Sequence, residues 1–556
     1  MPHSIAAIRS GRTRAALLAF ALLVATPADA QQRADTLGGT LLRAVHPWLG
    51  QGGSFTDVQR IVTAMHGADS DGDLRWTTVD GAARPAALAT LAFLARDPDA
   101  SAAQRADAVA LKDSLSRTAD ARRSVNLQRA LFDVGVDILV ARNAFVHRQG
   151  LIDPTRVHVE WSLQPAEVDL AAVRASLLEG RTPAEVFASL EPQTESYQRL
   201  VRALAAVRAQ DADTAPRLPA PPKRTITTGA RYAGARPLAR VLVALGELPP
   251  TFPVAGVRNV YTRPMSDAVS RWYNRKLKKG RVNGALSDSV LAALLDEYHG
   301  RADRIAMAIE RWRWLPRTFS NDPLVVNLPE FRLQTYARFE GDSADPLGMN
   351  VVIGRADSNA TPVFAANMTL VVFSPQWHVP KSIMLGEILP AATADPGYLA
   401  KHDYELTTGT GRVVPVTARN IAKIGTGVMV RQKSGDDNSL GKVKFLLPNP
   451  YDIYLHDTPA RTLFSRTRRD FSHGCVRLGD PMALARYVLG SQPVWTDSKI
   501  TEAMDAGVER YVRVPKPIPV LIVYQTAVAG PTGAVRYFND VYGHDRTLAD
   551  AFAKVR

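Results

Sequence analysis

The sequence has almost no cysteine: Cys475 is the single one among 556 residues. An intrachain disulfide is therefore impossible, and a zinc site built on several thiolates is excluded. The 11 histidines form no H-E-x-x-H motif, and most of them stand alone in the sequence. We therefore expect neither a metal site nor a cofactor.

Long apolar runs are also missing beyond residue 30, where no stretch approaches the roughly 18 residues that indicate a membrane-spanning helix. The composition, with 46% apolar, 22% charged and 7% aromatic residues, is that of an ordinary globular protein. Disorder of the whole chain, collagen and a polytopic membrane protein are excluded. The length predicts roughly three to four domains. The net charge of +14 would attract an acidic polymer, whether nucleic acid, an anionic membrane or another.

The first 30 residues have the pattern of a secretory signal peptide. Three arginines precede an apolar run at 15–26, and Ala28-Asp29-Ala30 is typical of a cleavage site. The run is short for a permanent anchor, which needs about 20 residues, although an uncleaved anchor is the alternative. Cleavage would remove three arginines and one aspartate and lower the net charge from +14 to +12. We therefore expect an exported protein, for which nucleic acid is a poor partner.

Breakers and changes of periodicity divide the rest of the chain. Apolar residues at three- and four-residue spacing predict a helical scaffold, and a stretch with five prolines predicts a linker after it. Short helical segments follow, with Ser287 as the expected cap of the last one. From Leu324 onward the pattern is typical of a mainly antiparallel β domain. The sequence thus predicts a multidomain α+β protein with a signal peptide at 1–30, an α-helical scaffold at 31–212, a linker at 213–237, a small helical module at 238–297, a connecting helix at 298–321, a β domain at 322–545 with a lid-like insertion at about 386–437, and a C-terminal tail at 546–556.

The residues that carry chemistry gather near the single cysteine. His456 ends an apolar, strand-like run, and Ser472-His473-Gly474-Cys475 follows after a gap of 15 residues. A thiol attacks an acyl carbon as thiolate, so it needs an imidazole nearby to take its proton. His456 and His473 are both available, and His473 would share a side with Cys475 in an extended segment. Gly474 would allow a tight turn that presents N–H groups to an oxyanion. An inert buried cysteine is the alternative, but the histidine- and glycine-rich setting favours catalysis.

This pattern, His followed by 15 residues and Ser-His-Gly-Cys, resembles the motif of the YkuD-type L,D-transpeptidases. The stretches VVNLPEFRLQ, FSPQWHVPKSI and NSLGKVKFLLPN resemble strands and loops of the large Gram-negative members. Their fold implies a sandwich or barrel for the catalytic domain at 322–545. It also implies a small peptidoglycan-binding module at 238–297. That module is degenerate here, because Trp272-Tyr273 stands where Phe-Gln is typical.

The resemblance implies a mechanism in which Cys475 attacks the carbonyl of the third residue of a peptidoglycan stem and expels D-alanine. The acyl group then passes from the thioester to an amine of another stem, which forms a cross-link expected to be of the 3→3 type. His456 is the implied base, oriented by a backbone carbonyl or by Asp457. The resemblance also implies an oxyanion-binding turn formed by His473, Gly474 and Cys475, with Ser472 shaping the site and Tyr454 lining the acyl pocket. Trp377 would line the substrate channel or be a buried aromatic, and Arg477 would pair with a stem carboxylate or form a structural ion pair. Four further arginines would steer an anionic stem or simply be solvated: Arg461, Arg466, Arg468 and Arg469.

Three alternatives stay open. Water in place of the acceptor amine would give an L,D-carboxypeptidase, and a lysine acceptor would attach an envelope protein to the wall. A wall-binding scaffold without activity is the third, against which the intact pair of His456 and Cys475 argues. The expected location is the periplasm, the expected partners are peptidoglycan stems and other wall-synthesis enzymes, and a carbapenem is the expected covalent inhibitor.

Overall fold

The computed structural model describes most of the chain beyond residue 74, and the expected signal peptide lies outside the described residues. Within the described part, no helix combines the length and the apolar character needed to cross a membrane. The ranges described are 75–78, 82–116, 125–158, 161, 163, 165–213, 216–276, 283–340, 347–395 and 397–555.

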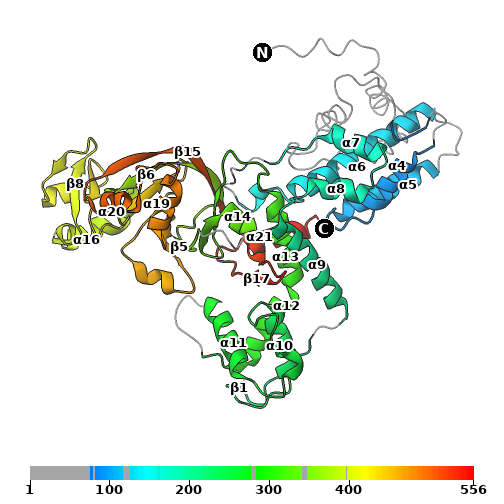
Figure 1. Ribbon diagram of the computed structural model, residues 1–556, viewed down its shortest axis with the longest axis horizontal. Coiled ribbons are helices and arrows are strands. Elements are labelled where there is room, and N and C mark those ends of the chain that lie inside the picture. Colours follow the sequence, from blue (N-terminus) through cyan, green and yellow to red (C-terminus); the bar gives the residue numbers. More distant parts are fainter. Residues whose placement is uncertain are drawn as a thin grey trace, which may run out of the picture.

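Helices build the described part of the chain up to residue 213, and α4 to α8 lie at one end of the molecule in Figure 1. A buried cluster joins α4, α6, α7 and α8, as the three- and four-residue spacing of their apolar residues requires. Thr182 begins α8 with a capping box in which Glu185 is the reciprocal partner. The elements are α4 (Pro85–Leu94), α5 (Ala102–Ser116), α6 (Val125–Gln149), the 3-10 turn η3 (Pro154–Arg156), α7 (Leu170–Leu178), α8 (Pro183–Leu190) and α9 (Glu195–Asp213).

Two helices lie at the centre of the molecule, although the sequence suggested a peripheral place for both. The expected connecting helix is α13 (Arg301–Arg313), and ten of its residues are buried. It packs against α9 and against strands of the C-terminal domain in one apolar cluster. The expected C-terminal tail contains α21 (His544–Ala553), whose Leu548 and Phe552 are buried beside Trp314. Figure 1 shows α9, α13 and α21 between the scaffold helices and the β domain.

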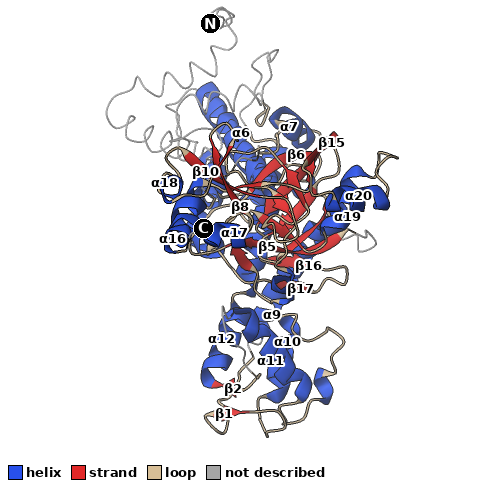
Figure 2. Cartoon of the chain, turned by 90° about the vertical axis from the view of Figure 1, so that its left-hand side faces the viewer, coloured by secondary structure: helices blue, strands red, loops and turns tan. Residues whose placement is uncertain are grey.

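The small helical module projects from the rest of the chain in both overall views (Figures 1 and 2). Ser287 caps α12 by accepting from the Val290 N–H, which confirms that expectation. The expected linker is partly integrated, because Ile226 pairs with Leu286 and the Tyr232 hydroxyl donates to a carbonyl at residue 219. The elements are β1 (Thr225–Ile226), α10 (Ala235–Ala244), η4 (Val254–Gly256), α11 (Arg263–Lys276), β2 (Leu286–Ser287) and α12 (Asp288–His299).

The C-terminal domain is built on one nine-stranded sheet, in the order β13-β5-β14-β12-β11-β6-β15-β3-β4. Strand β4 also pairs with β5, so the sheet closes into a barrel. Pairings are antiparallel except β12 with β14, β13 with β5 and β15 with β3. The predicted multidomain α+β fold with a mainly antiparallel catalytic domain is therefore confirmed. The strands are β3 (Leu324–Asn327), β4 (Arg332–Thr335), β5 (Gly348–Gly354), β6 (Phe364–Phe373), β11 (Val443–Leu446), β12 (Leu455–His456), β13 (Asp470–Ser472), β14 (Val476–Leu478) and β15 (Arg510–Val523).

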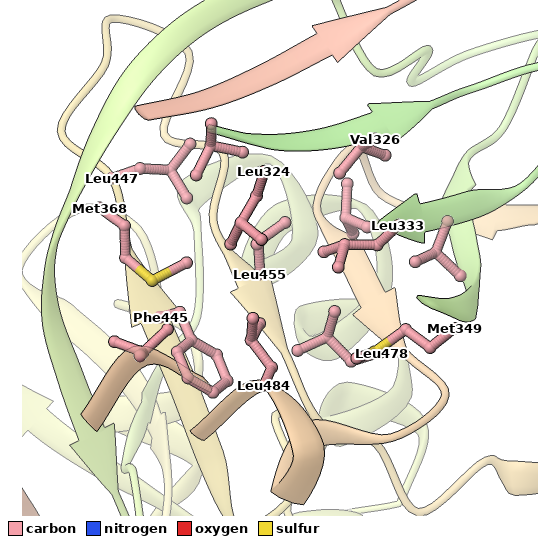
Figure 3. Close-up of a cluster of buried hydrophobic side chains, with 14 of the residues drawn as sticks. Leu324, Val326, Leu333, Met349, Met368, Phe445, Leu447, Leu455, Leu478 and Leu484 are labelled. Carbon is pink, nitrogen blue, oxygen red and sulfur yellow. The ribbon is translucent and has the colours of Figure 1, made fainter. Parts of the chain in front are cut away.

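Apolar side chains fill the barrel, as Figure 3 shows for a cluster that includes Leu324, Phe445, Leu455 and Leu478. These four side chains are fully buried. Burying each such side chain is worth about 1.5–3 kcal/mol. Around this core lie α14 (Tyr336–Glu340), η6 (Arg461–Ser465), α19 (Pro481–Leu489), α20 (Asp497–Asp505), β16 (Ala527–Ala529) and β17 (Val535–Tyr537).

The insertion between β6 and β11 has a four-stranded sheet, in the order β7-β10-β8-β9, and an apolar cluster of its own. It begins earlier than the expected residue 386, because Trp377 pairs with Gln432 in that sheet. The elements are β7 (Trp377–His378), α15 (Lys381–Ile383), the π-helical turn η5 (Met384–Ile388), α16 (Leu389–Ala394), α17 (Gly397–Lys401), β8 (Tyr404–Thr408), β9 (Val413–Val414), α18 (Ala418–Ile421) and β10 (Val428–Gln432).

Candidate active site

The candidate base lies on strand β12, and the candidate nucleophile directly precedes the neighbouring strand β14. The strands are parallel, with Leu455 opposite Val476 and His456 opposite Arg477. Leu455 and Val476 are fully buried in the barrel core. Side chains alternate along a strand, so His456 and Cys475 share the other face, on strands about 5 Å apart. The strand alternation thus puts the two side chains on the same face of the sheet.

A backbone carbonyl orients His456, whose side chain is buried. Its Nδ1 lies 2.5 Å from the carbonyl oxygen of Asp457. A carbonyl can only accept, so Nδ1 carries the proton in this bond, and the ring also hydrogen-bonds to the Leu440 backbone. The Asp457 carboxylate turns away, because it accepts from the Lys442 N–H at 3.0 Å and pairs with Arg461 at 3.2 Å. Of the two orienters that the sequence left open, the structure therefore has the backbone carbonyl.

The thiol of Cys475 lies against the segment that leads into β12. It donates to the carbonyl oxygen of Asp452, with the sulfur 3.6 Å away. The backbone N–H and the hydroxyl of Tyr454 both act on the sulfur as donors. The Tyr454 ring also lies 5.6 Å from the His456 ring, between centroids. Tyr454 therefore contacts both candidate catalytic side chains.

Burial keeps both groups in their neutral forms. It raises the pKa of Cys475 to about 11, an effect that the Tyr454 donors and the positive charge of Arg477 oppose. Burial also lowers the pKa of His456 to about 3, with the charge of Arg477 acting in the same direction. At neutral pH both the thiol and the imidazole are therefore neutral. Such a base takes the proton during the attack instead of holding a preformed ion pair.

The turn before Cys475 depends on Gly474, whose φ of +118° strongly favours glycine. Thr361 Oγ1 donates to the Gly474 carbonyl at 2.6 Å. Ser472 Oγ accepts from the Gly474 N–H at 3.2 Å and donates to the Cys475 carbonyl. Ser472 is 1% exposed, so it positions the turn and has no open surface for the expected substrate contact.

The N–H groups of the turn are not equivalent. The Gly474 N–H already donates to Ser472. The Cys475 N–H has no acceptor among the residues that the structure describes. The Cys475 N–H is therefore the better placed donor for an oxyanion.

His473 lies in a bend and not in the extended segment that would give it the same side as Cys475. The bend at Gly474 breaks the alternation, and His473 is exposed. Its Nε2 lies 2.6 Å from Oε1 of Glu387, in the π-helical turn η5 of the insertion. His473 therefore connects the turn to the insertion.

Trp377 and Arg477 both reach the site. Trp377 is half-buried in β7 and hydrogen bonds to the Tyr454 hydroxyl, so it links the insertion to the thiol.

Arg477 acts electrostatically on both His456 and Cys475. Its buried Nε has no hydrogen-bond partner, and no carboxylate pairs with its guanidinium within the described ranges. Within the described ranges, Arg477 therefore does not form the structural ion pair that was the alternative role for it.

The arginines between base and nucleophile mostly have structural partners. Arg461 pairs with Asp457, and Arg468 with Asp470 at 2.6 Å. Arg469 donates to the carbonyl oxygens of residues 351, 331 and 466. The side chain of Arg466 is exposed and makes no hydrogen bond or ion pair with the described residues. Of the four, Arg466 is therefore the one whose guanidinium is not already engaged.

Sequence reasoning missed several supporting residues. A Cβ on Gly354 would lie 1.9 Å from the Asn359 carbonyl oxygen and 3.0 Å from the Gly474 Cα. Likewise, a Cβ on Gly441 would lie 2.4 Å from the Asp457 side chain. Thr361 holds the turn from more than a hundred residues away. The two glycines and the threonine lie in loops or at a strand end, so periodicity gives no signal for them.

A group that resembles a metal site lies far from this one in the sequence. Ligand atoms of Asp97, Asp99 and His147 lie within 4.8 Å of one another. Both ring nitrogens of His147 already face carboxylates, Asp97 at 2.9 Å and Glu191 at 2.7 Å. Arg313 pairs with Asp99 at 2.8 Å. The group is therefore an ion-pair network.

A thiol, an oriented imidazole and an available N–H on one face of a barrel form a site suited to acyl transfer through a thioester. Residues 322–497 match the family model of the L,D-transpeptidase catalytic domain, YkuD, and residues 48–204 match that of the Scaffold domain. The chain thus combines a segment similar to the YkuD catalytic domain with a segment similar to the Scaffold domain.

A protein of Haemophilus influenzae named "Putative L,D-transpeptidase" is 33% identical over 247 residues. The match covers 44% of this chain and 48% of that relative, so it spans about half of the relative's length.

Proposed function

We propose that the protein is a cysteine-dependent peptidoglycan L,D-transpeptidase of the periplasm. His456 Nε2 takes the thiol proton as Cys475 Sγ bonds to the carbonyl carbon of the third stem residue. The tetrahedral intermediate then expels D-alanine, whose amine receives that proton from His456, and a thioester remains. An amine of a second stem attacks the thioester, loses a proton to His456 and releases the thiol, which leaves a cross-link proposed to be 3→3.

The shared face of His456, on β12, and Cys475, directly before the neighbouring β14, carries this proposal, in a domain that matches the YkuD model. Arg477 supports it, because a guanidinium without a carboxylate partner suits a stem carboxylate. Tyr454 and Trp377 would line the acyl pocket. The net charge of +14, or +12 after removal of residues 1–30, suits an anionic wall polymer.

The decisive experiment incubates the protein lacking residues 1–30 with a disaccharide-tetrapeptide and follows the products by mass spectrometry. We expect a dimer that lacks one D-alanine, and fragmentation will identify the acceptor residue. Cys475→Ala should abolish the product. His456→Ala should lower its rate by about 10²–10⁴-fold, the usual contribution of a general base. A carbapenem should add to Cys475 in the wild type and not in Cys475→Ala.

The other outcomes separate the alternatives. Tripeptide without dimer would indicate a carboxypeptidase, and transfer to a lysine peptide would indicate protein attachment. No turnover together with no carbapenem adduct would leave a non-enzymatic wall-binding scaffold. Full activity of Cys475→Ala would refute the thioester mechanism.

A further inference from the structure

A second cavity, of about 270 Å³, lies where α9, the β4–α14 corner and the β16–β17 hairpin meet. It is well separated from the candidate active site. Along β5, Gly348 pairs with Gln334 beside the cavity, whereas Gly354 packs on the catalytic turn. Six residues of strand separate these two glycines, which is roughly 20 Å. A ligand in this cavity would therefore not touch Cys475.

The walls of the cavity carry a surplus of positive charge. Arg332, Arg338 and Arg536 line it, together with a single acid, Glu330. Both oxygens of Glu330 are engaged, one with Arg536 at 3.0 Å and the other with the Asn327 amide at 3.3 Å. Within the described ranges, Arg332 has neither an ion pair nor a hydrogen bond of its side chain. Burial lowers the pKa of Arg332, the charge of Glu330 opposes this effect, and the like charges of Arg338 and Arg536 add to it. Three arginines thus share one carboxylate, which leaves a surplus of positive charge in the cavity.

A buried amide also lines the cavity without a partner. Gln334 is 6% exposed, and its side chain makes no hydrogen bond to any described residue. Gln334 and Arg332 share one face of β4, since the residue between them, Leu333, is fully buried in the barrel core. The amide can therefore donate to and accept from a ligand that enters the cavity.

We propose that this cavity binds a small oxyanion, a carboxylate or a phosphate, between the Arg332 guanidinium and the Gln334 amide. The planar fork of arginine matches the two oxygens of such a group, and the amide N–H₂ adds a third donor. Arg338 and Arg536 add attraction. Because the cavity touches α9 as well as the barrel, a bound anion would connect the scaffold to the catalytic domain.

Isothermal titration of the full chain tests this proposal, with inorganic phosphate as one probe and glutarate as the other, in a low-salt buffer. We expect one site per chain for at least one probe, and the probe that binds more tightly identifies the source as phosphate or carboxylate. Arg332→Gln should weaken binding at least about tenfold, in line with the loss of a charge-assisted pair. The matched control, Arg513→Gln, changes an exposed arginine on β15 outside the cavity and should bind as the wild type does.

Gln334→Leu keeps the size of the side chain and removes the amide, so it should fold at least as stably while binding several-fold more weakly. This variant keeps the test valid if Arg332→Gln does not fold, as judged by circular dichroism. Absence of binding by both probes at millimolar concentration would overturn the proposal. An equal loss in Arg513→Gln and Arg332→Gln would also overturn it, since it would indicate general charge attraction.

Discussion

Arg477 is the charged residue that acts on both the thiol and the imidazole, so its removal should change the pH dependence of the site. Its positive charge favours the thiolate of Cys475 and disfavours protonated His456. In Arg477→Gln, the pKa of Cys475 should rise above its present value of about 11. The rate of alkylation by iodoacetamide at pH 9 should then fall, about tenfold for each unit of pKa. A series of alkylation rates from pH 7 to 11 measures this change.

Arg466→Gln is the matched control, because Arg466 lies in the same segment with an exposed side chain. Its alkylation profile should follow the wild type. Identical profiles for Arg477→Gln and the wild type would show that the charge of Arg477 does not reach the thiol.

The sequence predicted the reactive pair better than the residues that support it. His456 and Cys475 share a face because each is one position from a buried residue on its strand, and that alternation is local. The expectation for His473 assumed an extended segment, which the positive φ of Gly474 interrupts. Thr361 could not have been found, because its hydrogen bond to the turn spans 113 positions in the sequence.

At the scale of elements, strand β5 supports the catalytic turn through a close approach of two backbones. Gly354→Ala would place a Cβ 1.9 Å from the Asn359 carbonyl oxygen and against the Gly474 backbone. Displacing backbone atoms is energetically costly, so overpacking should lower the stability by about 1–3 kcal/mol. The turn should also move, which we expect to reduce kcat at least about 10²-fold. Thermal melting and the transpeptidase assay measure the two effects.

Gly409→Ala provides the comparison, since nothing lies within 4 Å of a Cβ built at that position. Its stability and kcat should both stay close to those of the wild type. If Gly354→Ala also left the stability and kcat unchanged, the close approach of β5 would have no role in holding the turn.

The insertion shows why element boundaries are difficult to predict from sequence. Residues rich in glycine, threonine and charge suggested a start near 386, but the sheet of the insertion begins with Trp377. The pairing of Trp377 with Gln432 joins positions 55 apart, and a two-residue strand has too few side chains to show a period. Composition therefore marked the middle of the insertion and missed its first strand.

At the scale of the whole molecule, α13 carries more of the architecture than a connection would. Arg313 on this helix pairs with Asp99 and Glu191 of the scaffold, at 2.8 and 3.0 Å. Arg311 pairs with Asp545 of α21 at 2.6 Å. Scaffold, central helix and C-terminal helix are thus joined by buried ion pairs. The sequence showed the helix but not its burial, because the charged residues on α13 usually indicate exposure.

His147 gives this network a dependence on pH. The carboxylates of Asp97 and Glu191 raise the pKa of His147 to about 9, against the effect of burial, from an ordinary value of 6.5. The stabilising contribution of His147 is therefore complete below about pH 6.5 and is lost as the pH rises through 9. The pKa values of Asp99 and Glu191 are lowered, with Arg313 as a shared cause, so their contributions are lost as the pH falls through the acid range.

The shift of His147 corresponds to about 3 kcal/mol. We therefore expect the Tm of the wild type to fall between pH 6.5 and 9.5, by roughly 2–4 °C for each kcal/mol in domains of this size. His147→Gln should be less stable at pH 6.5 and should lose this part of the pH dependence. His299→Gln, at an exposed histidine on α12, should keep the wild-type profile. The measurement is calorimetry at one scan rate, and parallel curves for the wild type and His147→Gln would contradict a charged His147 in the network.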